Sequence, residues 1–549
     1  MNAIACSCDT NSLINLDVLG NDWQHTPMLN SQSYSTSALF KLCQMFVLLT
    51  VCLGLPLSAL GSDQKTNIEA THAKARATYE SVKLPKNEDM GFLGATILFD
   101  VNDWLSTGVG AYGALVGQRG GFITLGGAVE ARREISPWLE LNSGVFVGAG
   151  GGRGGYQLAG GGLMLRYHLG AELKSERWGN LGAGFSYIDF PDGTIHSSQP
   201  YISYEYPFKT LMSSGWFESS ESYSDDSAFL PKSEHEFSVV SRTYRIPNGV
   251  MQDNGNRPQH PTINLVGVEW NRYLSDHYFI RVESEGAMGG KSNGYMQILF
   301  GGGYRVSLLD NTYMKLTTSA GVAGGGAVAT GGGFLVDATV ALQQRLGDRL
   351  FAEIAAGYVL APGADFKAMS YAGKLGYYFH TPDFSGERVS VSSLRDFEPL
   401  NLRVRLAHQS YFKASPQWRT HHADLNVDLL GVQADYFMNE NFFLTGQGIA
   451  AYEGKAGAYM TGLVGAGVHL PIMGSPLYTE AELLIGAAGG GGMAVGGGLV
   501  WQGSAGLGYQ LNKAYSIQAS YGHMSALKGA FKANTLTLSI GYRFSFFLQ

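Results

Sequence analysis

Apolar and polar residues alternate along most of the chain, and the clearest case is the stretch 535–544 near its end. Positions 536, 538, 540, 542 and 544 hold Leu, Leu, Ile, Tyr and Phe, whereas the positions between them hold Thr, Ser, Gly and Arg. Successive side chains of a β-strand point to opposite faces, so this period of two predicts a strand with one apolar face. The pattern returns at 202–208 and 371–379, each time before a polar linker. The sequence therefore predicts three units that each end in such a strand.

The end of the last strand, Gly541-Tyr542-Arg543-Phe544, resembles the terminal strand of bacterial outer-membrane β-barrel proteins, which the assembly machinery of that membrane reads. The resemblance covers this strand and its two upstream copies, and it concerns an architecture. It implies a transmembrane antiparallel barrel in the outer membrane of a Gram-negative cell. The partners it implies are outer-membrane lipid or lipopolysaccharide and the barrel-assembly machinery.

Composition agrees with a barrel in lipid. The 549 residues include 75 glycines, only 15% are charged and 12% are aromatic. An apolar outside, a polar inside and glycine at bends and close approaches explain this combination better than a soluble domain does. The formal net charge of −7 and the absence of a basic stripe exclude a nucleic-acid partner.

The N-terminal region is predicted to carry an export signal. All four cysteines lie within residues 1–52, and an apolar run at 42–60 follows Lys41 and ends at Ala59-Leu60-Gly61. This pattern predicts a secretory signal peptide over residues 1–61, with Met28 as an alternative start. Cleavage after Gly61 leaves a mature chain without cysteine and hence without disulfides.

Strand patterns and short turns then recur in a similar order, which indicates an internal triplication. Units two and three show about eight strands and unit one about seven, so an all-β transmembrane barrel of about 23–24 strands is expected. One large barrel is slightly favoured over three tandem small barrels, because unit one lacks a strand for closing alone. The expected segments are a polar arm or short helix at 62–90, units at 91–208, 234–380 and 402–549, and disordered linkers at 209–233 and 381–401.

Charged residues fall on the inward-facing positions of the predicted strands. They either line a water-filled lumen or join into a closed interior, and the sequence leaves both possibilities open. The candidate lumen-lining residues are Arg166, His168, Glu172, Arg281, Glu283, Glu285, Asp337, Arg345, Glu353 and Lys374.

Each unit contains one hairpin with two glycine triplets. Glycine permits the bending that closure of a sheet requires, and this mechanical interpretation is favoured. The alternative is a groove without Cβ atoms that accepts an acyl chain, a sugar or another backbone. The triplets begin at Gly150 and Gly160, at Gly324 and Gly331, and at Gly489 and Gly496.

One pair of residues resembles a catalytic site. His523 and Ser525 lie two apart on a strand and share its lipid-facing side, next to the final strand. This arrangement resembles outer-membrane lipid A deacylases, which implies Ser525 as nucleophile, His523 as base and Asn534 as the nearest orienting group. Polar residues at the headgroup level are the favoured interpretation, so no catalytic residue is assigned.

No metal site or cofactor is expected either. The adjacent His421 and His422 near Asp424 point apart in an extended chain. The function expected from these patterns is a porin-like channel that exports or takes up polar solutes or a polymer. A lipid-modifying acyl hydrolase and a non-conducting structural or surface-binding barrel are the alternatives.

Overall fold

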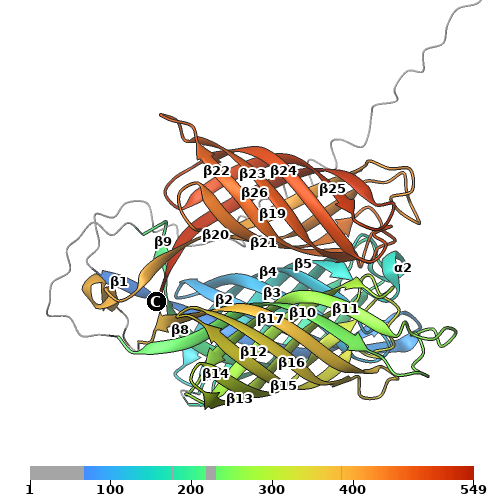
Figure 1. The fold of residues 1–549 in the computed structure, drawn as a ribbon, viewed down its shortest axis with the longest axis horizontal. Helices are drawn as coiled ribbons and strands as arrows, with labels where there is room; N and C mark the ends of the chain where they lie inside the picture. The colour runs from blue at the N-terminus through green and yellow to red at the C-terminus, as the bar shows by residue number, and fades with distance from the viewer. Residues whose placement is uncertain (1–66, 176, 218–229, 385, 387) are drawn as a thin grey trace, which may run out of the picture. The chain divides into compact units, whose positions relative to one another are not determined.

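The computed structural model describes residues 67–175, 177–217, 230–384, 386 and 388–549. Strands dominate these residues and form three antiparallel sheets that each close on themselves (Figure 1). No helix among the described residues is long and apolar enough to cross a membrane. The predicted signal peptide and its alternative start lie outside the described residues.

The first barrel closes through β1 and β8, for example between Ala75 and Tyr206. Its elements are β1 (Asn67–Leu84), η2 (Pro85–Asn87), β2 (Glu88–Asn102), β3 (Leu105–Val116), β4 (Ile123–Ser136), β5 (Leu139–Gly151), α2 (Gly155–Ala159), β6 (Leu163–Leu173), β7 (Asn180–Asp189) and β8 (His196–Leu211).

The second barrel closes through β10 and β17, for example between Val239 and Leu375. Its strands are β10 (Lys232–Arg245), β11 (Thr262–Tyr273), β12 (Tyr278–Gly289), β13 (Met296–Leu309), β14 (Thr312–Gly324), β15 (Phe334–Leu346), β16 (Leu350–Leu360) and β17 (Lys367–Pro382).

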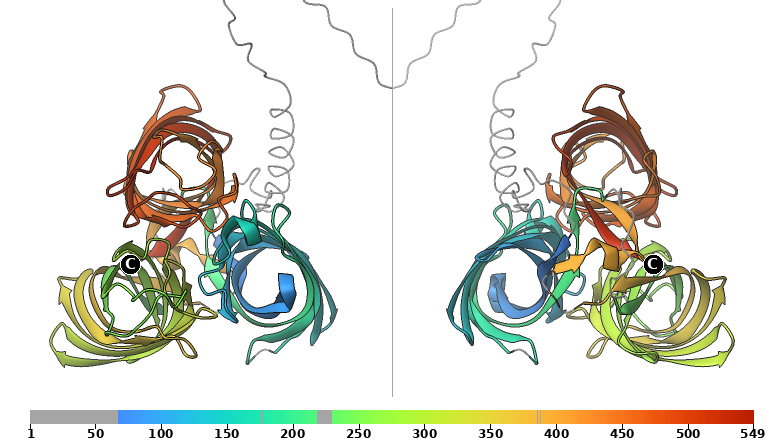
Figure 2. Two further views of the ribbon diagram at one scale, coloured as in Figure 1. Left: turned by 90° about the vertical axis from the view of Figure 1, so that its right-hand side faces the viewer. Right: turned by 90° about the vertical axis from the view of Figure 1, so that its left-hand side faces the viewer.

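The third barrel closes through β19 and β26, where Phe544 pairs with Leu402. Figure 2 shows each of the three barrels as a closed ring. The strands of the third barrel are β19 (Glu398–Lys413), β20 (Val427–Phe437), β21 (Phe442–Glu453), β22 (Met460–Pro471), β23 (Leu477–Gly489), β24 (Leu499–Gln510), β25 (Tyr515–Ala526) and β26 (Lys532–Leu548).

The predicted all-β barrel class with 24 strands is confirmed, whereas the preference for one large barrel is wrong. The strand that unit one lacked is β1, which lies in the segment 62–90 that was expected to be an arm or helix. The inward side of β1 carries charged residues and its outward side carries small ones such as Ala75 and Ala77. With Tyr79 among small and polar residues on the outward side, the period of two does not stand out. The first barrel therefore begins at Asn67 and not at residue 91.

The linkers are also more ordered than expected, as far as they are described. Short strands β9 (Ser213–Ser214) and β18 (Arg388–Ser390) pair with β26 and β1, and η3 (Val391–Leu394) follows β18. Apolar side chains from β1, β8, β18, η3 and β26 form one buried cluster, which stabilises this arrangement. Its members are Ile68, Leu211, Val389, Leu394, Phe397 and Phe547.

The barrels carry apolar side chains outside and polar ones inside. In β8, Ile202 and Tyr206 are 63% and 54% exposed, whereas Glu205 between them is fully buried. In β17, Leu375 is 68% exposed and the adjacent Lys374 is buried. Soluble domains bury their large apolar residues, so this inverted distribution is the one expected of barrels that contact hydrocarbon.

Candidate functional site: the barrel interiors

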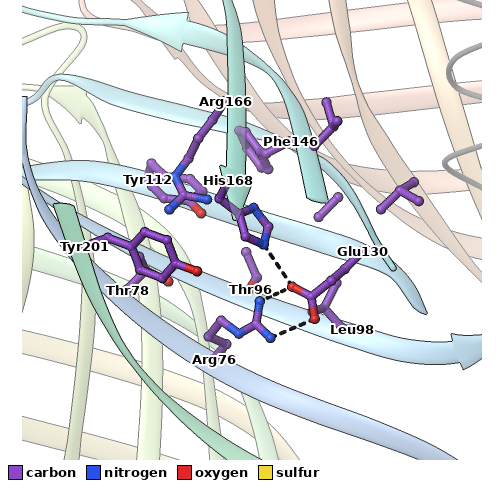
Figure 3. Close-up of a pocket in the computed structure, with 13 residues that line it drawn as sticks. Arg76, Thr78, Thr96, Leu98, Tyr112, Glu130, Phe146, Arg166, His168 and Tyr201 are labelled. Atoms are coloured by element: carbon purple, nitrogen blue, oxygen red, sulfur yellow. Dashed lines mark hydrogen bonds and ion pairs between the residues drawn. The ribbon is translucent and has the colours of Figure 1, made fainter. Parts of the chain in front are cut away.

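In the first barrel, a network of ion pairs surrounds Arg76 of β1. Its Nη2 atom lies 2.7 Å from a carboxylate oxygen of Glu172 and 2.6 Å from one of Glu205. Arg76 also pairs with Glu130, whose carboxylate lies 3.1 Å from Nε2 of His168 (Figure 3). Further pairs in this lumen are Lys74 with Glu140 and Glu205, and Arg166 with Glu80.

The second barrel has a network of the same kind. Arg242 donates to Glu285 at 2.9 Å and to Glu283 at 2.6 Å. Lys374 lies 2.8 Å from Glu269 and 2.7 Å from Glu353, and Glu353 also forms an ion pair with Lys315. All these side chains are almost fully buried. Further contacts join Arg281 to Glu269, Glu283 and Asp337, Arg242 to Asp337, and Lys315 to Glu236.

The third barrel is crossed by two arginines of β19. Arg403 donates to Asp435 at 2.8 Å and to Glu480 at 2.7 and 3.0 Å. Arg405 pairs with Asp435 at 2.8 Å and with Glu482 at 2.5 Å. These charges are paired and hydrogen-bonded, as buried charges must be if they are to remain ionised.

An apolar layer lies in each barrel at the end where the glycine hairpins lie. In the third barrel the loop between β19 and β20 supplies Trp418, which is fully buried near Tyr411 and Phe531. In the same loop, burial lowers the pKa of Arg419, whose guanidinium donates to the carbonyl of Leu425. The corresponding layers centre on Phe92, Phe122 and Phe190 in the first barrel and on Tyr244, Tyr295 and Phe366 in the second.

Little free space remains beside these groups in the first barrel. The first lumen contains a cavity of about 20 Å³, lined by residues that include Arg76, Tyr112, Arg166 and Tyr201 (Figure 3). A single water needs at least about 10–15 Å³ of such volume. The cavity therefore holds a water molecule or two and is too small for an organic solute.

The predicted lumen-lining residues all lie in these barrels, but they form ion pairs with one another or with other buried side chains and do not line an open channel. Arg345 lies nearer an end of the second barrel, where its Nη2 atom lies 3.0 Å from Glu234. The sequence prediction missed the central Arg76 because β1 was not assigned as a strand. It also missed Arg403 and Arg405, although their alternation with Leu402, Val404 and Leu406 was a usable signal.

The candidate catalytic residues lie on the outward-facing side of β25 and β26 in the third barrel, where Ser525 is buried. Nδ1 of His523 lies 3.0 Å from Oδ1 of Asn534 on the neighbouring strand, and the indole of Trp501 is close to the imidazole. The hydroxyl of Ser525 donates to the carbonyl of Ala526 at 3.4 Å. Within the described ranges no hydrogen bond joins Ser525 to His523, so the pair is not arranged as a nucleophile with its base.

The glycine triplets lie where β5, β14 and β23 end and where the strands after them begin. Several of these glycines have positive φ, among them Gly150, Gly324 and Gly331, which agrees with the expected bending of the hairpins. Other close approaches in the hairpins involve the backbone of a different barrel. Neither His421 nor His422 belongs to a cluster of metal-ligating residues within the described ranges.

Closed antiparallel sheets with apolar outer faces and charged inner faces define this chain as a transmembrane β-barrel protein of the outer-membrane type. The outer membrane is where such barrels of Gram-negative bacteria reside, so the class also gives the location. No family model matches the chain, and no curated protein matches it.

Among solved structures, the chain is similar to a mutant ferric enterobactin receptor of Pseudomonas aeruginosa, with a TM-score of 0.25, 8% identity and coverage of 87% of this chain and 82% of that one. It is similar to the siderophore receptor PirA of Acinetobacter baumannii, with a TM-score of 0.25, 9% identity and coverage of 87% and 81%. It is also similar to a BenF-like porin of Pseudomonas fluorescens, with a TM-score of 0.22, 10% identity and coverage of 87% and 98%. At these TM-scores the comparison supports no conclusion about substrate or mechanism. The assignment to the class of outer-membrane barrels rests on the strand pairing and on the two faces of the barrels.

Proposed function

We propose that this protein is a non-conducting structural barrel protein of the outer membrane. The observation that carries the proposal is that buried ion pairs and an apolar layer lie inside each of the three barrels, and that the cavity in the first lumen is only about 20 Å³. The groups around the barrels are then outer-membrane lipid or lipopolysaccharide, and the barrel-assembly machinery inserts the protein.

Energetics support closed lumens. Removing one partner of a buried ion pair costs about 3–5 kcal/mol, because a charge is left without compensation. A path through the third barrel requires at least the contacts of Arg403 and Arg405 to separate and Trp418 to leave its place. Spontaneous opening to a polar solute is therefore rare.

Conductance in planar bilayers tests the proposal. Purified, heat-modifiable protein is expected to give no unitary current steps at either polarity, under conditions in which a reference porin inserts and conducts. The expectation applies equally to a Lys528→Met variant, which changes an exposed loop charge. Regular current steps from the folded protein would refute closed lumens.

A pore for polar solutes or a polymer is the second candidate, and one observation favours it. In the first lumen the paired carboxylates outnumber the lysine and arginine side chains, as with Glu130, Glu172 and Glu205 around Arg76. Acidic linings select cations. If the lumens open, the current is expected to be cation-selective, and reversal potentials in a KCl gradient measure this.

A lipid-modifying acyl hydrolase is the third candidate. The hydrogen bond between His523 and Asn534 favours it, whereas the hydroxyl of Ser525 donates to the carbonyl of Ala526 and not to His523. A nucleophilic serine requires a base within hydrogen-bond reach and a group that orients the base. Mass spectrometry of lipid A from cells that produce the protein or its Ser525→Ala variant tests this. Lipid A that loses an acyl chain only with the unmodified protein would establish the activity, and identical spectra would exclude it.

A further inference from the structure

The glycine hairpins contact another barrel in the same way three times. The last glycine of each second triplet faces the carbonyl of an alanine in a different barrel. A Cβ atom on Gly333 would lie 2.3 Å from the oxygen of Ala114, and one on Gly498 would lie 2.5 Å from that of Ala287. On Gly162 it would lie 2.2 Å from the oxygen of Ala451.

The first triplets repeat the arrangement against the loop that follows the receiving strand of the same neighbour. A Cβ atom on Gly324 would lie 2.4 Å from the backbone nitrogen of Gly121, and one on Gly489 would lie 2.1 Å from that of Gly294. On Gly151 it would lie 2.7 Å from the nitrogen of Ala458. Backbone hydrogen bonds accompany the contacts, from Gly120 to Gly331 at 2.8 Å, from Gly457 to Gly160 at 3.2 Å and from Ala458 to Gly150 at 3.2 Å.

The order of these contacts is cyclic. Strand β14 of the second barrel packs on β3 of the first, β23 of the third packs on β12 of the second, and β5 of the first packs on β21 of the third. Each barrel therefore uses its hairpin for one neighbour and its third strand for the other. Such a heterologous contact forms a ring when the rotation closes, and here it closes after three barrels.

We propose that the glycine hairpins are docking surfaces that lock the three barrels of one chain into a closed ring. The partner of each hairpin is the third strand and following loop of another barrel. All three hairpins and all three receiving strands are used within the chain, so this surface is not available for a second copy. This inference concerns the outside of the barrels and does not depend on whether their lumens are closed.

Glycine suits this role for a physical reason. Within a bilayer the hydrophobic effect does not drive barrels together, because lipid tails are as apolar as leucine. Association then depends on close packing of backbones, which small residues allow. Between the first and second barrels, Nε of Arg153 also lies 3.6 Å from a carboxylate oxygen of Asp253. Between the first and third barrels, the rings of Tyr156 and His422 meet edge to face.

Disulfide trapping tests the docking in the full chain. A Cβ atom on Gly286 of the second barrel would lie 3.1 Å from Cβ of Ala487 of the third. A small shift of the backbone brings the pair into the range of about 3.5–4.5 Å found in disulfides. The double variant Gly286→Cys/Ala487→Cys is expected to form a disulfide in the folded protein, seen as a mobility change on a denaturing gel without reductant. Gly373→Cys/Ala487→Cys is the matched control, because Gly373 has nothing within 4 Å of its Cβ position, and it is expected to stay reduced.

A second variant links the disulfide to the hairpin. Adding Gly489→Leu places a side chain against Gly294 at a residue whose φ is not in the left-handed region. The disulfide yield is expected to fall at least tenfold while the barrels remain heat-modifiable, whereas Gly462→Leu, whose Cβ position is open, leaves the yield unchanged. A folded double-cysteine variant that stays reduced, or full yield with Gly489→Leu, would overturn the proposal.

Discussion

The Arg403→Met substitution tests whether the ion pairs hold the third barrel together. Arg403 is fully buried and donates to Asp435 and to both oxygens of Glu480. Methionine retains much of the volume and removes the charge. Asp435 then keeps Arg405, but Glu480 keeps only His469 at 2.6 Å and Arg405 at 3.6 Å.

The expected loss follows from this imbalance. Removing one partner of a buried ion pair costs about 3–5 kcal/mol. With a urea dependence of about 2 kcal/mol per molar, the unfolding midpoint of this barrel falls by about 1.5–2.5 M. In equilibrium terms this is about two to three and a half orders of magnitude, since about 1.4 kcal/mol corresponds to a factor of ten.

Urea titration of the protein in lipid vesicles, followed by heat-modifiable mobility on gels, measures the midpoint. Lys528→Met removes an exposed charge in the same barrel and is expected to leave the midpoint in place. Arg403→Met/Glu480→Leu removes both partners and is expected to regain part of the loss, because replacing a whole buried pair by apolar groups is often neutral. If Arg403→Met unfolds at the midpoint of the unmodified protein, the ion pairs do not stabilise the barrel.

Three further substitutions test other parts of the structure. Leu375→Arg changes a residue that is 68% exposed on the outer face, and in vesicles it is expected to cost up to about 2–4 kcal/mol, depending on its depth in the bilayer; a neutral result in the urea titration would mean that this face does not contact lipid. Trp418→Ala removes a fully buried side chain from the apolar layer of the third barrel and is expected to cost about 3–5 kcal/mol in the same assay, so an unchanged midpoint would contradict the layer's role. Gly161→Leu places a side chain against the carbonyl of Tyr452 in the third barrel; it is expected to increase protease access at the contact of the first and third barrels, and unchanged cleavage would count against a close fit there.

The faces of the strands could be predicted from the sequence, since alternation is a local property. Residues 202–208, 371–379 and 535–544 carry a period of two that requires no knowledge of distant contacts. The same pattern predicted that large apolar side chains such as Leu375 face outward and that charged residues such as Lys374 face inward, as the structure places them. Where the outward residues are small, as in β1, the local signal vanished and the strand was missed.

Closure and docking were decided only by the tertiary structure. Whether Phe544 pairs with Leu402 or with the first unit depends on hydrogen bonds between segments more than a hundred residues apart, and alternation is the same in either case. The partners of Arg403 likewise come from β20 and β23. The sequence does not show which backbone packs against a given glycine. The contact of Gly498 with Ala287 in another barrel therefore became visible only in the arrangement of the backbones. The sequence determined the two faces of each strand, because that depends on neighbouring residues, whereas the number of barrels and their contacts depended on which distant strands and loops meet.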